Sequence, residues 1–266
     1  MIDMHTHILP HIDDGAKDST MSAFVLKKEL EEGVKTIVFT SHYYGRRHSP
    51  ARFLERRASA FGKIKDKIPE GLEIRLGAEV HFTGVNVAEY EELCKLAIEG
   101  TKYILIEFPF TEKWTYELLD KLADFISETG YTPIIAHVER YREVQKRLAY
   151  ITELIDMGCL IQVNTNAFLD KRDKKLAYAL LKNGMVHCIG TDTHDLENRA
   201  PNYTETYEAV KKAGFDEEWM TIQANMQKIL ADEEVEITTP KVLKKFFGKF
   251  YKKKCVLQMK NVFIIK

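Results

Sequence analysis

The chain has 266 residues, of which 45% are hydrophobic and 30% are charged, a composition typical of a compact soluble protein. One large domain is expected at this length, because α/β barrels of about 250 residues fold as single units. The 39 basic and 40 acidic side chains nearly cancel, which excludes a global positive field for nucleic acid, and no run of about 18 apolar residues could cross a bilayer.

Four cysteines are dispersed along the chain without a C-x-x-C pair: Cys94, Cys159, Cys188 and Cys255. This spacing argues against a zinc knuckle or a disulfide framework, and it favours a reducing compartment with the cysteines in the core. A cleaved leader would remove His5, so none is expected if that histidine is functional. We therefore expect a cytoplasmic protein.

Short apolar segments alternate with longer amphipathic ones in chain order. The apolar segments, which we expect to be strands, are 2–7, 35–42, 72–79, 103–109, 132–138, 159–165 and 186–194. Segments such as 19–33 and 115–130 carry apolar residues at helical spacing and end in glycine, as helices do. This alternation predicts repeated β–α units around a parallel sheet, and seven strands are enough for a barrel.

The expected strands end in polar residues of the kinds that bind metals. In chain order these residues are His5 and His7, His42, Glu79, Glu107, His137, Asn164, and Asp192 with His194. The C-terminal ends of barrel strands meet on one face, so these side chains should gather in one site. A single histidine after a strand is more often structural, but an ionised Glu107 in an apolar strand is costly unless it is paired or binds a cation. The joint pattern therefore predicts a metal site.

The other four histidines lack this position at a strand end. They are His11, His48, His81 and His187, and we interpret them as surface or packing residues.

The ligand types limit the choice of metal. Nitrogen and oxygen ligands without sulfur favour manganese, iron or zinc, and do not choose among them. Arg140 and Arg199 follow strand-end ligands closely enough to bind phosphate oxygens in the pocket, with surface salt bridges as the alternative.

Six motifs together resemble a known group of enzymes. They are MIDMHTHILPHIDDGA at 1–16, TSH at 40–42, GAEV at 77–80, KYILIEFPF at 102–110, IIAHVERYRE at 134–143 and GTDTH at 190–194. In these motifs the chain resembles the polymerase and histidinol phosphatase (PHP) superfamily and, within it, the bacterial protein-tyrosine phosphatases of the CpsB and YwqE type. The similarity runs from Met1 to about Phe247.

The resemblance implies a fold and a set of ligands. The fold is a distorted (β/α)7 barrel over residues 1–239, with the active site at the C-terminal ends of its strands and three divalent ions, usually manganese. The ligands implied are His5, His7, Asp192 and a bridging Glu79 for the first ion, Glu79, Glu107 and His137 for the second, and Asp14, His42 and His194 for the third.

The resemblance also implies an activity. A metal-bound hydroxide would attack phosphorus in line and hydrolyse phosphotyrosine on a tyrosine kinase that controls capsule or exopolysaccharide synthesis. No cysteine has an arginine six residues later, so a cysteine-dependent phosphatase is excluded. A histidinol-phosphate phosphatase and a metal-bound binding module without turnover remain alternatives. We expect a monomer that does not bind nucleic acid.

Two stretches depart from the family pattern. The run TSHYYGRRH at 40–48 has Tyr43 where relatives commonly have a second histidine, and its loop is more basic, which bears on the rim that meets the substrate. Residues 164–166, Asn-Thr-Asn, replace an expected serine-rich segment, and we assign them no role beyond the pocket wall.

The last part of the chain, 240–266, is expected to lie outside the barrel. Its segment 240–254 has lysines throughout, no acidic residue, and apolar residues at roughly helical spacing. One interpretation is a helix docked on the barrel with a solvated basic face. The other is a peripheral contact with an anionic membrane surface.

Overall fold

The computed structural model describes residues 1–83, 88–110, 113–237, 243–246 and 249–252. Its strands are β1 (Ile2–Thr6), β2 (Thr36–Phe39), β3 (His42–Tyr43), β4 (Glu73–Leu76), β5 (Glu79–His81), β6 (Tyr103–Glu107), β7 (Thr132–Ile135), β8 (Leu160–Asn164), β9 (Cys188–Gly190), β10 (Leu243–Phe246) and β11 (Lys249–Lys252). Among the described residues, no helix combines the length and the apolar character that a membrane crossing requires.

The strands β1 to β9 pair in parallel and form two sheets. β1, β2 and β4 form one sheet, and β3, β5, β6, β7, β8 and β9 form another. The predicted strand 35–42 is interrupted after Phe39 and gives β2 and β3, and the predicted strand 72–79 is interrupted after Leu76 and gives β4 and β5. Because β3 pairs with β5 as β2 pairs with β4, the two sheets continue each other around the curl.

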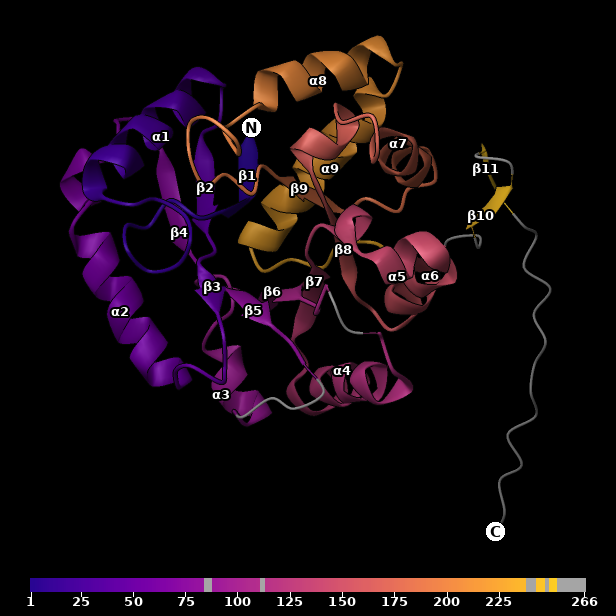
Figure 1. Cartoon of the computed structure of the whole chain (residues 1–266), viewed down its shortest axis with the longest axis horizontal. Helices are drawn as coiled ribbons and strands as arrows, with labels where there is room; N and C mark the ends of the chain where they lie inside the picture. Colours follow the sequence, from indigo (N-terminus) through magenta and orange to yellow (C-terminus); the bar gives the residue numbers. More distant parts are fainter. Residues whose placement is uncertain (84–87, 111–112, 238–242, 247–248, 253–266) are drawn as a thin grey trace.

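The last strand of the curl returns to the first. The main chain of Asp192 donates to the carbonyl of His5 at 2.7 Å, and that of His7 donates to the carbonyl of Thr193 at 2.8 Å. A Cβ atom at Gly190 would lie 2.4 Å from the Cβ of His5, so only glycine allows this approach. The predicted distorted parallel barrel is confirmed, with the helices arranged around the sheet (Figure 1).

The helices follow the strands as predicted. They are α1 (Ser19–Glu31), α2 (Pro50–Gly62), α3 (Tyr90–Cys94), α4 (Tyr116–Thr129), α5 (Arg142–Lys146), α6 (Ala149–Asp156), α7 (Lys174–Lys182), α8 (Tyr203–Lys212) and α9 (Asp216–Leu230), with 3-10 turns at Lys65–Lys67, Val138–Arg140 and Thr165–Phe168. Asp18 caps α1 by accepting from the main chain of Thr20 and Met21, both at 2.8 Å. Gly130 ends α4 in the left-handed conformation, with φ at 68°.

The core lies between the curled sheet and the helices. β6 and β8 are buried along their whole length. Burial on both faces explains why β6 begins as the apolar run Tyr103–Ile106 rather than as an alternating strand. Cys159 and Cys188 are buried, as predicted, whereas Cys94 is half-buried and Cys255 lies outside the described residues.

The described part of the C-terminal segment is not helical, although a docked helix over 240–254 was one of its two interpretations. Leu243–Phe246 and Lys249–Lys252 form the antiparallel strands β10 and β11, and β10 contacts α6. Both strands contain phenylalanine, and aromatic residues favour strands over helices. The other residues of 240–266 lie outside the described part, so the membrane contact stays a prediction.

Candidate metal centre

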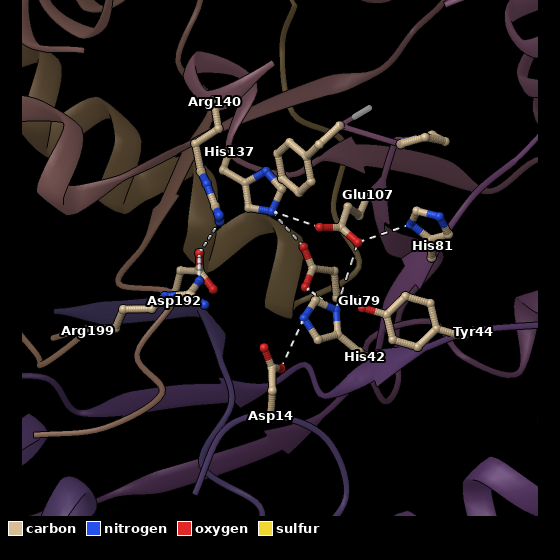
Figure 2. Close-up of a pocket in the computed structure, with 12 residues that line it drawn as sticks. Asp14, His42, Tyr44, Glu79, His81, Glu107, His137, Arg140, Asp192 and Arg199 are labelled. Atoms are coloured by element: carbon tan, nitrogen blue, oxygen red, sulfur yellow. Dashed lines mark hydrogen bonds and ion pairs between the residues drawn. The ribbon is translucent and has the colours of Figure 1, made fainter. Parts of the chain in front are cut away.

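A pocket opens at the C-terminal ends of the strands, as the sequence predicted (Figure 2). Its lining includes these predicted residues: Asp14, His42, Glu79, Glu107, His137, Arg140, Asp192 and Arg199. The remaining predicted ligands, His5, His7 and His194, are buried around it, with at most 4% exposed surface. The structure therefore brings together every side chain that the sequence assigned to the metal site.

The side chains form four groups of three or four ligand atoms, and within each group the atoms lie within 4.8 Å of one another. The groups are His7, Asp14, His42 and His194; His5, Glu79 and His137; His5, His7 and Asp192; and His42, Glu79 and Glu107. They overlap with the implied ligand sets but are not identical, because His42 also reaches Glu79 and Glu107. The division of ligands among three ions stays a prediction.

The hydrogen bonds of the first two histidines fix which nitrogen faces the pocket floor. The Nδ1 of His7 lies 2.9 Å from Asp13 Oδ2, and the Nδ1 of His5 lies 3.3 Å from Gln162 Oε1. Because both partners are acceptors, each Nδ1 donates to its partner, which turns each Nε2 toward the floor. The two Nε2 atoms are 3.1 Å apart, a spacing that suits two ligands of one shared cation.

The carboxylate of Glu79 lies at the centre of this floor. Its Oε2 is 2.9 Å from His42 Nδ1 and 3.3 Å from the Nε2 atoms of His5 and His7, and its Oε1 is 2.8 Å from His137 Nε2. Oε2 is buried and accepts no hydrogen bond within the described part of the chain. A buried oxygen of this kind, surrounded by imidazole nitrogens, fits a bridging ligand of divalent cations.

The charges of the floor are set by its neighbours. Burial would raise the pKa of Glu79, but the nearby imidazoles, His5 and His42 first, hold it well below its ordinary value. Burial likewise opposes ionisation of Asp192, and His5, His7 and Arg199 outweigh it to hold its pKa well below the usual range. Both carboxylates are therefore charged at neutral pH and available to cations.

Two predicted ligands adopt strained backbone conformations. His137 has a φ of 33° and Asp192 a φ of 56°, although neither is glycine. Such conformations are retained where the surrounding structure requires a particular side-chain direction, and they are frequent at functional sites. Here they direct both side chains into the pocket.

Asp13 supports the floor and was missed by the sequence reasoning. Its Oδ2 contacts His7 Nδ1 and also accepts from the main chain of His42 at 2.9 Å. Burial works against its ionisation, but His7 and His42 lower the pKa of Asp13 to about 2. A Cβ atom at Gly15 would lie 2.0 Å from His7 O, so this glycine allows the loop to carry Asp13 to the histidine. The signal was the pair of adjacent aspartates before a glycine.

Two amides on β8 form a second support. Gln162 Oε1 accepts from the main chain of His137 at 2.6 Å, and its Nε2 donates to Asn164 Oδ1 at 2.9 Å. Asn164 Nδ2 donates in turn to Asp192 Oδ2 at 2.9 Å. Asn164 therefore orients the predicted ligand Asp192, which corrects the prediction that Asn164 has no role beyond the pocket wall. The sequence signal for this role was a pair of amides in a strand expected to be buried, because buried amides need hydrogen-bond partners.

Both predicted arginines reach into the pocket. Arg140 Nη1 donates to Asp192 Oδ2 at 2.8 Å. Arg199 pairs with the same carboxylate, and its Nη1 lies 2.8 Å from His194 Nε2. Both guanidinium groups line the pocket and both pair with Asp192, so their binding of phosphate stays a prediction.

The rim contains residues that the sequence reasoning placed elsewhere. His81, interpreted as a surface or packing residue, lines the pocket, with its Nδ1 3.1 Å from Glu107 Oε2. Tyr43 does not reach the rim, because it is buried against Phe53. Its neighbour Tyr44, which directly follows β3, lines the pocket instead.

The opposite wall is also aromatic. Phe110 lines the pocket with its ring 5.3 Å from that of His137, and the guanidinium of Arg140 lies 4.9 Å from the ring of Phe110. Of the other histidines, His11 is exposed, His48 is half-buried and His187 is buried, in agreement with surface or packing roles.

The whole described barrel matches a known family. Residues 1–231 match the model of the CpsB/CapC family of capsular polysaccharide synthesis. The tyrosine-protein phosphatase CpsB of Streptococcus pneumoniae is 31% identical over 243 residues, which cover 88% of this chain and 99% of that protein. The tyrosine-protein phosphatase YwqE of Bacillus subtilis is 30% identical and covers 94% of this chain and 100% of that protein.

Solved structures agree with these relatives. A crystal structure from a study of YwqE and CpsB, described there as metal-dependent tyrosine phosphatases, aligns with a TM-score of 0.77 at 26% identity, covering 92% of this chain and 100% of that chain. The family model stops at residue 231, so the predicted domain boundary at 239 stays a prediction. The motifs, the fold and these relatives lead to one conclusion: the chain belongs to the CpsB/CapC family.

Proposed function

We propose that this protein is a metal-dependent protein-tyrosine phosphatase. The observation that carries the proposal is one pocket in which buried imidazole and carboxylate ligands lie beside two arginines. Imidazoles and carboxylates bind divalent ions, and guanidinium groups match phosphate oxygens. The relatives named tyrosine-protein phosphatase, which align over nearly their whole length, support the same activity.

The proposed cofactor is a set of three divalent ions. The residues that would hold them are His5, His7, Asp14, His42, Glu79, Glu107, His137, Asp192 and His194. Three such ions against four carboxylates leave the site about two charges positive, which suits a phosphate dianion. We propose manganese, with iron and zinc as alternatives that the same ligand types accept.

The reaction proposed is hydrolysis of an aryl phosphate ester. Bound divalent ions lower the pKa of water and stabilise charge on the attacking and leaving oxygens of an in-line displacement. Arg140 and Arg199 would hold the phosphoryl oxygens and stabilise the charge that develops on them. The aromatic walls at Tyr44 and Phe110 would bind the ring of the tyrosine.

We further propose a tyrosine kinase of capsule or exopolysaccharide synthesis as the substrate. The family description and the names of the relatives support this setting. A cytoplasmic monomer fits such a role, and a contact of 240–254 with the inner face of the membrane would bring it near a membrane-bound kinase.

The proposal is tested by measuring phosphate release from a phosphotyrosine peptide and from histidinol phosphate, each with and without chelator. We expect hydrolysis of the peptide that stops with chelator and returns with added manganese. Preference for histidinol phosphate would indicate the small-molecule phosphatase instead. Metal binding without turnover of either compound would indicate a binding module.

A further inference from the structure

A group of arginines lies beside the pocket, on the loop after β3 and the first turns of α2. The group, which we call the arginine ridge, consists of Arg46, Arg47, Arg52 and Arg56. The first three are exposed and Arg56 is half-buried. Over Pro50–Gly62 the only acidic residue is Glu55. The ridge is therefore a local positive surface on a chain whose net charge is close to zero.

The ridge continues directly from the pocket wall. Tyr44 lines the pocket, and the guanidinium of Arg47 lies 4.9 Å from the centre of its ring. A turn holds this contact, because the main chain of Arg47 donates to Tyr44 O at 2.8 Å. A peptide leaving the pocket over Tyr44 would reach Arg47 first.

The other end of the ridge adjoins the opening loop of the chain. Arg56 Nη2 donates to Ile12 O at 3.1 Å, two residues before Asp14, which lines the pocket. The charges are also close to one another. Desolvation lowers the pKa of His48, and the nearby charges of Arg56, Arg52 and Arg47 lower it further. The ridge thus adjoins the pocket lining at two points, Arg47 beside Tyr44 and Arg56 beside the loop that carries Asp14.

Within the described part of the chain, the ridge charges have no carboxylate partner. Among the described residues, none of the four arginines forms an ion pair with a carboxylate, whereas Arg140, Arg147 and Arg199 all do. Arg57 is excluded from the ridge, because its Nη1 donates to Gly77 O at 2.7 Å and it is partly buried. A row of unpaired guanidinium groups is suited to carboxylates or phosphates of a partner.

We infer that the arginine ridge binds acidic residues that flank the phosphotyrosine of the substrate. This inference rests on the proposed phosphatase activity, and it adds a preference for sequence context. The partner it fits is an extended peptide with glutamate, aspartate or further phosphotyrosine beside the scissile one. Complementary charge at the mouth raises the rate of encounter and selects among otherwise similar peptides.

The test compares peptides of equal length in which phosphotyrosine is flanked by glutamate or by alanine. For each enzyme the readout is the ratio of kcat/KM for the two peptides, with free phosphotyrosine as the reference substrate. At low salt we expect wild type to favour the glutamate peptide roughly 5-fold, since each exposed ion pair contributes only a small factor. The ratio should approach one in the R47A/R52A double variant, and in wild type at 0.5 M salt.

A matched control keeps the number of removed charges constant. Lys63 and Lys65 are exposed beyond the far end of α2, so K63A/K65A should keep the wild-type ratio. Equal ratios in wild type and R47A/R52A, with free phosphotyrosine still hydrolysed, would overturn the proposed binding of acidic residues by the ridge. They would leave the proposed function intact. No hydrolysis of either peptide or of free phosphotyrosine by wild type would instead overturn the proposed function.

A membrane is the competing partner for a basic surface. Sedimentation of the same variants with acidic phospholipid vesicles separates the two cases. Loss of vesicle binding in R47A/R52A, together with an unchanged peptide ratio, would assign the ridge to a lipid surface and overturn the proposal.

Discussion

At the floor of the pocket His5, His7 and Glu79 have no exposed surface, whereas at its rim 39% of the Arg140 side chain and 34% of the Arg199 side chain are exposed. The floor is held by strand backbone and by a second layer of buried hydrogen bonds from Asp13 and Gln162. The rim comes from loops. We therefore expect the floor to determine metal binding and the rim to determine how the substrate is held.

The largest expected effect is at the centre of the floor. Glu79→Gln removes a charge that the account assigns to two ions, so metal content and turnover should fall together, with turnover reduced more than roughly 100-fold. Excess manganese should restore activity only in part. Metal analysis beside steady-state rates checks this, and a full metal complement with normal kinetics would break the distinction between floor and rim.

A rim substitution should separate binding of phosphate from binding of metal. In Arg199→Ala, Asp192 keeps its hydrogen bonds from Asn164 and Arg140, so we expect the ions to stay bound. Loss of a charge-assisted contact should cost roughly 1.5 to 3 kcal/mol of transition-state stabilisation.

Aryl preference should survive in this variant, because a phenol with a pKa near 10 leaves with little acid assistance. Arg172→Ala removes an exposed arginine away from the pocket and should leave kcat/KM unchanged. Loss of metal in Arg199→Ala would contradict the assignment.

An intermediate effect is expected in the layer beneath the floor. Asp13→Asn should weaken metal binding by roughly 10- to 100-fold, because it removes the carboxylate that orients the His7 ring. Unlike Arg199→Ala, this variant should recover its turnover at high manganese. Titration of activity against manganese measures the shift, with the exposed Asp120→Asn as control. A wild-type manganese dependence would show that Asp13 does not position the ligand.

The contrast between floor and rim also marks what the sequence could predict. Floor ligands end strands, and hydrophobic runs locate strand ends well, so His5, Glu79 and His137 could be assigned to one face before the fold was known. Arg140 and Arg199 follow such ends within a few residues.

The rim could not be predicted in the same way, because the path of a loop depends on tertiary contacts. His81 lies two residues beyond a ligand and points into the pocket only because β5 continues past Glu79. Tyr43, on the two-residue strand β3, is buried, and the pocket is lined instead by Tyr44, the residue that follows the strand. Asp13 and Gln162 were missed because their partners, His7 and His137, become neighbours only when the loops and strands assemble.

The smallest effect on turnover is expected at His187, which is buried outside the pocket. Its Nδ1 accepts from the main chain of Ile161 at 2.9 Å, and burial lowers the pKa of His187 to about 4. An unfolded histidine has a pKa of about 6.5, so between these values the unfolded chain binds a proton that the folded chain does not. The free energy of unfolding should therefore fall as pH drops from about 6.5 to 4, by roughly 3 kcal/mol.

Urea unfolding in the presence of chelator, at several pH values in this window, measures the slope without a contribution from metals. His187→Asn keeps an acceptor for the Ile161 amide but does not titrate, so its slope should be smaller. Equal slopes in the two proteins would show that His187 does not contribute to the pH dependence.

The most direct test of the metal assignment is anomalous diffraction at the manganese edge from crystals soaked with manganese and phosphate. We expect three peaks, each within ligand distance of one implied set of side chains, and a phosphate between these peaks and the guanidinium groups of Arg140 and Arg199. A single peak away from Glu79, or a phosphate bound without contact to either arginine, would contradict it.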